Sequence, residues 1–329
     1  MSTLKTILIT GATGFVGAHL IRHFANTPFY VIALGRTKTP PAELLACADE
    51  YFQADIIHDN LPTAADIIIH TAGLASDTAK WEDLKNVNFV GAKRLFTEVK
   101  HQFFLHISSA SVYPKGAVPH HEEEVIPIDK LNDYGKSKRL AEEFLLSKEN
   151  VCILRPRAIY GTNDRVILPK ILAMKKGPFV MSPCHLRRKV SLTHIGNLVQ
   201  AIELCISQPE KSANQIFNVT DDDTYILHDI VKSIHEMVYK RPVSIKNLPF
   251  SVSKQLSKVF ANLGISSKIN DTVLDMLCHD NVFNIDKIKQ TLGYQPRQNF
   301  EQVLPDIGKW LEGKDVAAFV KAPEGAAWG

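Results

Sequence analysis

A tyrosine and a lysine stand four residues apart at the start of a helical pattern. The segment reads Tyr134-Gly135-Lys136-Ser137-Lys138, and apolar residues continue at helical spacing as far as Leu145. Residues i and i+4 share one helix face, so the phenol and the Lys138 ammonium are expected to converge on one site. A nearby ammonium favours the phenolate form and therefore lowers the pKa of a phenol toward neutral pH. Such a group can take a proton from an alcohol or give one to a ketone.

Hydroxyl side chains follow a predicted strand at residues 103–107. The sequence there reads Ser108-Ser109-Ala110-Ser111-Val112-Tyr113. The carboxyl edge of a parallel sheet faces the ligand crevice, so a hydroxyl at this point is suited to hydrogen-bond a substrate oxygen together with Tyr134. Serines at strand ends also serve simply as caps or turn residues, and for each serine that interpretation stays open.

Three glycines lie between the first predicted strand and the first predicted helix, in Thr10-Gly11-Ala12-Thr13-Gly14-Phe15-Val16-Gly17. Gly11 permits a tight turn, Gly14 lets the backbone approach a pyrophosphate, and Gly17 lets the helix pack close to the sheet. The helix start offers free N–H groups and a positive dipole end. The order strand, glycines, helix predicts a dinucleotide site rather than a plain glycine turn.

The second predicted strand ends in Leu34-Gly35-Arg36, with Lys38 close behind. An acidic residue at this point would bind the ribose 2′-hydroxyl of NAD, whereas a guanidinium suits the 2′-phosphate of NADP. We therefore expect NADP(H), with NAD as the open alternative, because Arg36 is also suited to stack on adenine or to face water.

Short apolar strands alternate with helical patterns through the first half of the chain. This alternation predicts a doubly wound parallel α/β sheet of the Rossmann type, covered on both faces. The expected strands lie at 6–9, 30–34, 66–70, 103–107, 151–154 and 215–219, and the expected helices include 15–24, 84–100 and 135–147.

The second half is less regular and predicts a smaller C-terminal substrate-binding cap. The Rossmann domain is expected at 1–155 plus roughly 190–235, the cap at roughly 156–189 plus 236–313, and a disordered tail at 314–329. The cap includes a helical stretch, 242–313. An amphipathic face there packs on its own domain or, as the minor alternative, lies on a membrane surface. This face comprises Val252, Leu256, Val259, Phe260 and Leu263.

Composition excludes several classes of protein. With 45% hydrophobic and 22% charged residues, the chain is an ordinary globular protein. A net charge of +3 and scattered Lys and Arg argue against nucleic acid as a partner. No apolar run approaches the length of a membrane span, and no signal peptide is evident. Five cysteines without C-x-x-C spacing argue against a disulfide framework or zinc site and indicate a reducing cytoplasm.

Together these motifs resemble the extended short-chain dehydrogenase/reductase family, of the NAD(P)-dependent epimerase/dehydratase type. The resemblance covers nearly the whole chain, beginning with the glycine motif at 10–17. Other matching segments are Ala54-Asp55-Ile56, His70-Thr71-Ala72-Gly73, Asn88-Phe89-Val90-Gly91, Ser108 to Tyr113, Arg155-Pro156-Arg157-Ala158-Ile159-Tyr160-Gly161, Ser191 to Leu198 and Leu292 to Pro296.

The resemblance implies roles for individual residues. It makes Ser109, Tyr134 and Lys138 catalytic, with Asn88 supporting the local helix geometry. Dimers through a four-helix interface are common in this family, so a homodimer is expected. The implied cofactor-binding residues are Gly11, Thr13, Gly14, Phe15, Val16, Gly17, Arg36, Asp55, Ile56, Thr71, Ala72, Gly73, Tyr134, Lys138, Pro156, Ala158 and Ile159.

Departures from the family pattern narrow the reaction. Ala110 and Ser111 stand where family dehydratases carry an acidic pair, which disfavours dehydration. Nucleotide-sugar epimerases place Asn and Arg where this chain has Ala158 and Val190, although basic residues at 187–189 lie nearby. Gly196-Asn197 resembles the 3β-hydroxysteroid dehydrogenase-like branch, whose members act on hydrophobic hydroxy or keto substrates.

Two acidic clusters offer weaker candidates. His120-His121-Glu122-Glu123-Glu124 has the residue types of a metal site, but adjacent ligands rarely share one ion, so a solvated loop is expected. Asp221-Asp222-Asp223 predicts a turn and a helix cap rather than a magnesium site. No metal is expected.

The leading hypothesis is an NAD(P)-dependent oxidoreductase that interconverts a ketone and a secondary alcohol at a Ser-Tyr-Lys site. The first alternative is a nucleotide-sugar 4-epimerase or 4-reductase. The second is a dinucleotide-binding sensor without turnover. An intact set of Ser109, Tyr134 and Lys138 argues against the sensor, because a sensor has no need of a tuned phenol.

Overall fold

Seven parallel strands form the central sheet of the protein, in the order β12-β6-β5-β4-β1-β2-β3. This computed structural model describes residues 4–76, 79–114, 119–124, 126–255, 274 and 277–321. The strands are β1 Lys5–Thr10, β2 Phe29–Gly35, β3 Glu50–Gln53, β4 Ile67–His70, β5 Phe103–Ile107, β6 Val151–Pro156 and β12 Gln215–Val219. All six strands expected from the sequence are present, and β3 is an addition.

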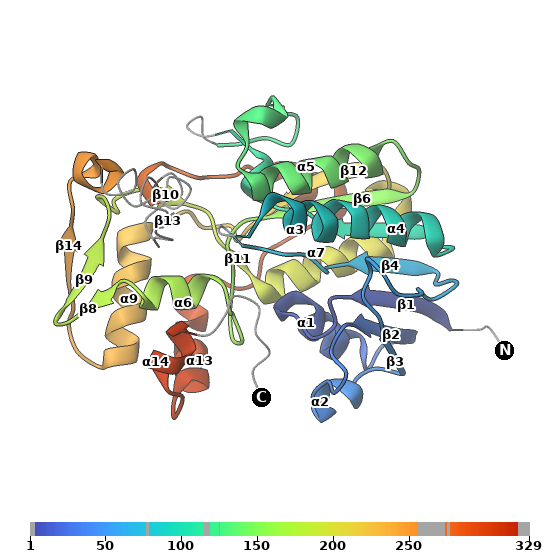
Figure 1. Ribbon diagram of the computed structural model, residues 1–329, viewed down its shortest axis with the longest axis horizontal. Helices are drawn as coiled ribbons and strands as arrows, with labels where there is room; N and C mark the ends of the chain where they lie inside the picture. The colour runs from blue at the N-terminus through green and yellow to red at the C-terminus, as the bar shows by residue number, and fades with distance from the viewer. Residues whose placement is uncertain are drawn as a thin grey trace.

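Helices cover both faces of this sheet (Figure 1). On one face, Ile7 and Ile9 pack with α1, Phe15–Phe24, and α7, Ile195–Ser207. On the other, Leu8 packs with α4, Gly91–Glu98, and α5, Asp133–Leu146. Alternate strand residues thus enter different cores. The doubly wound Rossmann arrangement predicted from the sequence is confirmed.

Short elements complete this part of the chain. A π-helical turn, η1, joins α3 to α4. Two strand pairs, β7 with β11 and β10 with β13, lie beyond the sheet. These elements are α2 Ala42–Leu45, α3 Trp81–Lys85, η1 Asn86–Val90, η2 Ala110–Val112, η3 Ile128–Lys130, β7 Ile159–Tyr160, β10 Lys189–Val190, β11 Thr193–His194, α8 Pro209–Ser212, β13 Tyr225–Ile226 and α12 Asp286–Leu292.

A second apolar core lies away from the sheet, on the left in Figure 1. It is built by α6, α9, α13 and α14 around the three-stranded sheet β14-β9-β8. Their bounds are α6 Ile167–Leu172, β8 Lys175–Lys176, β9 Phe179–Ser182, α9 Leu227–Tyr239, β14 Ser244–Asn247, α13 Phe300–Leu311 and α14 Val316–Lys321.

Two sequence predictions for this region differ from the structure. The expected helical stretch at 242–313 contains a strand, β14, which pairs with β9. Its burial alternates as in a strand, since Ile245 packs against the second core while both of its neighbours are exposed. The tail expected to be disordered from residue 314 contains α14, whose Phe319 is 1% exposed against Trp310. Of the predicted amphipathic face, Leu256, Val259, Phe260 and Leu263 lie outside the described residues.

A buried aspartate joins the two cores. Asp221 accepts hydrogen bonds from the Tyr160 hydroxyl at 2.7 Å, the Asn197 amide at 2.7 Å and the Tyr225 hydroxyl at 3.0 Å. Asn197 in turn accepts bonds from the backbone N–H groups of residues 297 and 298. The prediction that residues 221–223 form a turn and helix cap is wrong for Asp221, which holds β7, α7 and the segment before α13 together.

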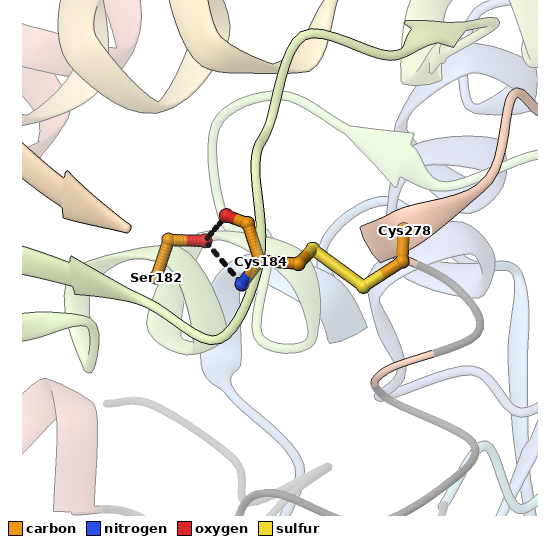
Figure 2. Close-up of a disulfide and its surroundings, with 3 residues drawn as sticks. All are labelled: Ser182, Cys184 and Cys278. Atoms are coloured by element: carbon orange, nitrogen blue, oxygen red, sulfur yellow. Dashed lines mark hydrogen bonds between the residues drawn. A yellow bond between two sulfur atoms is a disulfide. The ribbon is translucent and has the colours of Figure 1, made fainter. Parts of the chain in front are cut away.

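Cys184 and Cys278 form a disulfide, with their Cα atoms 6.1 Å apart (Figure 2). Ser182 supports this turn, since its hydroxyl bonds both the carbonyl and the N–H of Cys184. The sequence argument against disulfides is therefore wrong for this pair. The two cysteines are 94 residues apart, so their spacing in the sequence gave no sign that they would meet. Because disulfides are rare in reducing compartments, the cysteines no longer support a cytoplasmic location. No helix in the described part of the chain has the length and apolar character needed to cross a membrane.

Candidate active site

The loop between β1 and α1 forms a cradle of backbone groups. Gly11 has φ +69°, and a Cβ there would lie 2.9 Å from the backbone of Ala72. A Cβ on Gly17 would overlap the carbonyl of Gly11, so both glycines are required for the close packing of this loop. The first turn of α1 has no acidic residue and no side-chain cap. Its N–H groups and dipole therefore remain available to an anion.

The segment after β4 forms the next wall of the cradle. Thr71 donates its hydroxyl proton to Thr10 O at 2.7 Å, and Ala72 N–H donates to Thr10 Oγ1 at 3.2 Å. His70 lies fully buried beneath, with Nδ1 2.8 Å from the same Thr10 hydroxyl. Burial, together with the charge of Lys138, lowers the pKa of His70 to about 3, so its ring is neutral. These bonds hold residues 71–73 against the glycine loop.

The edge of the cradle at β2 carries the residue expected to select the cofactor. Arg36 is 74% exposed in its side chain, and its Nη1 lies 3.7 Å from Asp55 Oδ2. Thr13 and Thr37 share a hydrogen bond of 3.2 Å across the same edge. Ile56 is buried against Gly91 of α4. The structure thus brings the two charged candidates, Arg36 and Asp55, together, and the guanidinium stays accessible to solvent.

Helix α5 presents Tyr134 and Lys138 one turn apart. Asn132 caps the helix by accepting the N–H of Gly135 at 2.7 Å. Tyr134 is half-buried in the first turn, and Lys138 is 4% exposed, with Nζ donating to Ile107 O at 2.9 Å. Burial lowers the pKa of Lys138 to about 8, and the charge of Glu142 partly offsets that effect. Lys138 therefore ties the tyrosine helix to the end of β5.

The serine loop is packed tightly against the start of the same helix. Ser109 caps the short helix η2: its Oγ accepts the N–H of Ser111 and donates to Ser111 Oγ, both at 3.1 Å. A Cβ on Gly135 would overlap Ser111 O, so only glycine allows this approach. The half-buried Ser109 hydroxyl is thus both a cap and a group at the carboxyl edge of the sheet.

Asn88 connects the cofactor wall to α5. It lies in the π-helical turn η1, a feature often found at functional sites. Its side chain exchanges hydrogen bonds with the backbone of Leu74 at 2.8 and 3.1 Å and donates to Ser137 Oγ at 2.9 Å. A Cβ on Gly73 would lie 3.2 Å from both Asn88 Oδ1 and Lys138 Nζ. Residues 73, 88 and 138 therefore meet at one point.

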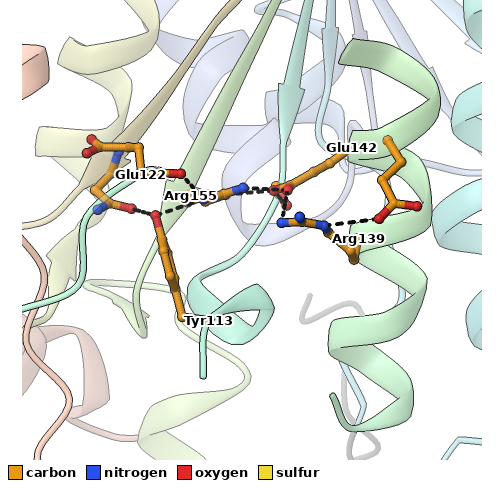
Figure 3. Close-up of polar contacts among 8 residues, drawn as sticks. Tyr113, Glu122, Arg139, Glu142 and Arg155 are labelled. Atoms are coloured by element: carbon orange, nitrogen blue, oxygen red, sulfur yellow. Dashed lines mark hydrogen bonds and ion pairs between the residues drawn. The ribbon is translucent and has the colours of Figure 1, made fainter. Parts of the chain in front are cut away.

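A buried ion pair lies directly behind the serine loop (Figure 3). Arg155 donates Nε and Nη2 to the two carboxylate oxygens of Glu142, at 2.9 and 2.7 Å. Its Nη1 donates to the Tyr113 hydroxyl at 2.9 Å and to the carbonyl of Glu122 at 3.1 Å. Sequence reasoning missed Glu142, although its position two turns after Tyr134 on the buried helix face was a signal. The pair anchors both ends of the loop that contains Ser109.

The histidine–glutamate cluster does not form the solvated loop that the sequence predicted. His120 and Glu122 are buried, and Glu122 accepts the backbone N–H of Asn218 at 2.8 Å. His120 bonds Glu124 at 2.8 Å and stacks on Tyr113. The segment is therefore part of the wall behind the ion pair. Among the described residues, no group of three His, Cys, Asp or Glu side chains is placed to hold a metal ion.

The segment after β6 forms the far wall of the crevice. Pro156 ends β6 and is buried, Ala158 has φ +45°, and Ile159 packs on the sheet core. Arg157 donates to Asn281 Oδ1 at 3.0 Å. Val190, which replaces the arginine of nucleotide-sugar epimerases, is buried in the second core. This wall consequently has no arginine at residue 190 that could bind a diphosphate.

The arrangement fits a nicotinamide dinucleotide. The glycine cradle and the uncapped start of α1 suit a pyrophosphate, Arg36 and Asp55 lie where an adenosine would end, and Lys138 is buried at the opposite end. The residues predicted to bind the cofactor lie at or after the ends of β1, β2, β3, β4 and β6 and on α5. These elements meet at the carboxyl edge of one sheet, which is where ligands bind in this fold.

Comparisons with known proteins agree with this architecture. The model of the "NAD dependent epimerase/dehydratase family" matches residues 7–220. UDP-glucose 4-epimerase of Vibrio cholerae is 27% identical over 322 residues, spanning 91% of this chain and 93% of that protein. The 3 beta-hydroxysteroid dehydrogenase/Delta 5-->4-isomerase of Mycobacterium tuberculosis is 25% identical over 333 residues, spanning 92% and 89%.

A solved structure shows the same fold. UDP-glucuronic acid 4-epimerase from Bacillus cereus, in complex with NAD, superposes with a TM-score of 0.71 at 20% identity. The match covers 95% of this chain and 99% of that one, so it includes the second core as well as the sheet.

Proposed function

Because the chain belongs to the NAD dependent epimerase/dehydratase family, we propose that it interconverts a ketone and a secondary alcohol at Ser109, Tyr134 and Lys138. One observation carries this proposal. Lys138 lies one turn after Tyr134 on α5 and donates to Ile107 O, two residues before Ser109. A single buried ammonium therefore connects the proposed acid/base to the loop with the proposed orienting hydroxyl.

Each side chain has a distinct role in the proposed reaction. The nicotinamide, when bound, supplies or takes up the hydride. The Tyr134 phenol gives a proton to the ketone oxygen or takes one from the alcohol, and Ser109 orients that oxygen by a hydrogen bond. The Lys138 ammonium favours the phenolate and holds the cofactor ribose. Asn88 supports the geometry by fixing Leu74 and Ser137.

The test is a Tyr134→Phe variant, which removes only the ionisable hydroxyl. Turnover of any carbonyl that the wild type reduces, followed as loss of NAD(P)H absorbance at 340 nm, should fall by roughly 10²–10⁴. Tyr30→Phe is the matched control, because Tyr30 is exposed on β2, away from the proposed site. Turnover of Tyr134→Phe near that of the wild type would refute the assignment.

We propose NADP(H) as the preferred cofactor, on the strength of the accessible guanidinium of Arg36 at the end of β2. Arg36→Ala should weaken NADPH binding by at least about tenfold, since a charge-assisted bond to the 2′-phosphate is lost, and leave NADH binding nearly unchanged. Dissociation constants from NAD(P)H fluorescence measure both. A wild-type preference for NADH would remove this argument.

A nucleotide-sugar 4-epimerase or 4-reductase is the second candidate. It is favoured by the similarity to UDP-glucose 4-epimerase over nine-tenths of both chains. The buried Val190 and the small Ala158 weigh against it, because neither side chain has a charge or a hydrogen-bond donor to offer a diphosphate. A UDP- or dTDP-sugar that raises the melting temperature of the cofactor-bound protein would favour this candidate. Absence of both such a shift and any carbonyl reduction would favour the sensor.

The remaining assignments follow from the same proposal. We assign cofactor binding to residues 1–155 plus roughly 190–235 and substrate recognition to roughly 156–189 plus 236–313. The substrate is a small carbonyl or alcohol compound or, under the second candidate, a nucleotide sugar. A homodimer and a cytoplasmic location stay predictions, to be checked by light scattering of the purified protein and by cell fractionation.

A further inference from the structure

Charge is segregated along this chain. Residues 165–202 and 237–270 hold thirteen of the 38 Lys and Arg residues and none of the 35 Asp and Glu residues. The remainder of the chain is consequently acidic, and the net charge of +3 conceals the difference. The sequence-based view that basic residues are scattered is wrong for these two segments. They are brought together where β14 pairs with β9.

The outward face of the sheet β14-β9-β8 is both basic and apolar. Phe179 pairs with Lys176 of β8, and Met181 pairs with Lys246 of β14. Paired residues lie on the same side of a sheet, and residues two apart along a strand do as well, so these four share one face. Val180, between Phe179 and Met181, is fully buried, which identifies its side as the inner one.

Apolar side chains on this face are exposed beside lysines. Phe179 is 40% exposed, and Lys246 Nζ lies 5.3 Å from the centre of its ring. The next segment repeats this combination: residues 250–255 are helical, Phe250 is 42% exposed and Val252 40%, and Lys254 Nζ lies 5.8 Å from the Phe250 ring.

The two groups are contiguous. The backbone N–H of Leu248 donates to Ser182 O at 2.9 Å, which joins the segment before the helical residues to the end of β9. In Figure 1 this part of the molecule lies at the extreme left, at the opposite end from β1 and the N-terminus. We name the surface formed by Lys176, Phe179, Met181, Lys246, Phe250, Val252 and Lys254 the basic–apolar face.

Two carboxylates of the described residues near the start of β14 are engaged by other groups. Glu236 accepts the N–H of Val243 at 3.2 Å and lies 3.9 Å from Lys232 Nζ. Glu312 lies 3.6 Å from Lys240 Nζ. The three lysines of the face therefore present their charge to solvent with no acidic residue in their own segments.

We propose that the basic–apolar face docks the protein on an anionic lipid bilayer. Lysines near an anionic surface are attracted to it, and the exposed Phe and Val side chains, with the half-buried Met181, gain by entering the boundary between headgroups and acyl chains. Nucleic acid would use the lysines, but phosphates and base edges offer little to Met181 and Val252. The bilayer is the partner whose chemistry uses both components. This inference is independent of the reaction proposed above.

The experiment is sedimentation of the full chain with vesicles in about 100 mM salt. The protein should bind vesicles of phosphatidylcholine with phosphatidylglycerol, bind weakly or not at all to phosphatidylcholine alone, and dissociate as salt rises. Lys176→Glu/Lys246→Glu should reduce partitioning by at least about 20-fold, because each basic residue near the surface contributes about fivefold. The matched control is Lys5→Glu/Lys100→Glu, which makes the same charge change at exposed residues of the sheet domain.

A second pair of variants tests the apolar component. Phe179→Ser should weaken binding at high salt, where charge attraction is screened, and Tyr30→Ser, at an exposed aromatic residue of β2, should not. Circular dichroism verifies that each variant is folded. The proposal is overturned if anionic vesicles do not bind the wild type, or if Lys5→Glu/Lys100→Glu weakens binding as strongly. It is also overturned if a short RNA binds more tightly than the vesicles and displaces them.

Discussion

The Ser108 hydroxyl donates to Glu142 Oε1 at 2.6 Å, joining the end of β5 to the helix that contains Tyr134 and Lys138. Both groups are buried, and the same carboxylate accepts two bonds from Arg155. Together with the Lys138 bond to Ile107 O, this contact fixes the strand end at two consecutive residues. The position of Ser109 relative to α5 is therefore set by side chains that need not touch substrate.

Removal of the Ser108 hydroxyl should loosen the serine loop and leave the fold intact. We expect Ser108→Ala to cost about 1–3 kcal/mol in the free energy of unfolding, because a buried hydrogen bond to a charged group is lost. Amide hydrogen exchange of residues 109–113 should accelerate, whether or not a substrate is known. Ser108→Thr, which keeps the hydroxyl, is the control, and unchanged exchange in Ser108→Ala would contradict a positioning role.

Breaking the Arg155–Glu142 pair should lower the free energy of unfolding strongly, whereas replacing both residues by apolar ones should lower it much less. Arg155→Met leaves the buried Glu142 carboxylate without its main partner, for a loss of about 3–5 kcal/mol in urea unfolding. The double variant Arg155→Met/Glu142→Met removes both charges and should recover a large part of that loss. If the double variant loses as much free energy of unfolding as Arg155→Met and Glu142→Met lose in sum, the two charges are not coupled in the way the geometry indicates.

Gly135→Ala should displace α5 from the serine loop. A methyl group at this residue overlaps Ser111 O, a backbone atom that has little freedom to move, so we expect a loss of about 1–3 kcal/mol and lower turnover. Gly308→Ala in α13 is the matched control: the added methyl meets the flexible end of Met237, and alanine favours helix. A Gly135→Ala protein as stable and active as the wild type would show that the close approach is unnecessary.

The buried Lys138 should make stability depend on pH in the alkaline range. Its folded pKa of about 8 lies below the ordinary value of 10.5, so between these values the unfolded chain binds more protons than the folded one. Stability of the cofactor-free protein therefore rises with pH through this window, and burial of the charge is costly below it.

Comparison with Lys138→Met isolates this effect. The stability of the variant relative to the wild type should be greatest near pH 7 and should decline as pH rises from about 8 toward 10.5, by a total on the order of 3 kcal/mol. Urea unfolding at several pH values measures the difference. A constant difference from pH 7 to 10 would mean that Lys138 is not held at a lowered pKa.

Residues close in sequence determined much of the fold and some of the proposed site. The apolar runs at 6–9 and 103–107 needed no partner to identify them as buried strands, and the glycines at 11, 14 and 17 recur every third residue from the end of β1 into α1. Tyr134 and Lys138 follow helical spacing, so their common face is a property of the helix itself. Local backbone geometry is sufficient for each of these inferences.

Only tertiary structure decided which distant groups meet. Glu142 of α5 pairs with Arg155 of β6, and the Asp221 side chain contacts three elements. Cys184 forms a disulfide with Cys278, which is 94 residues away in the sequence. The basic segments likewise form one face only because β14 pairs with β9. A sequence pattern reflects the periodicity of its own helix or strand, but it does not specify which elements pack against one another. Contacts between elements therefore depend on the folded chain.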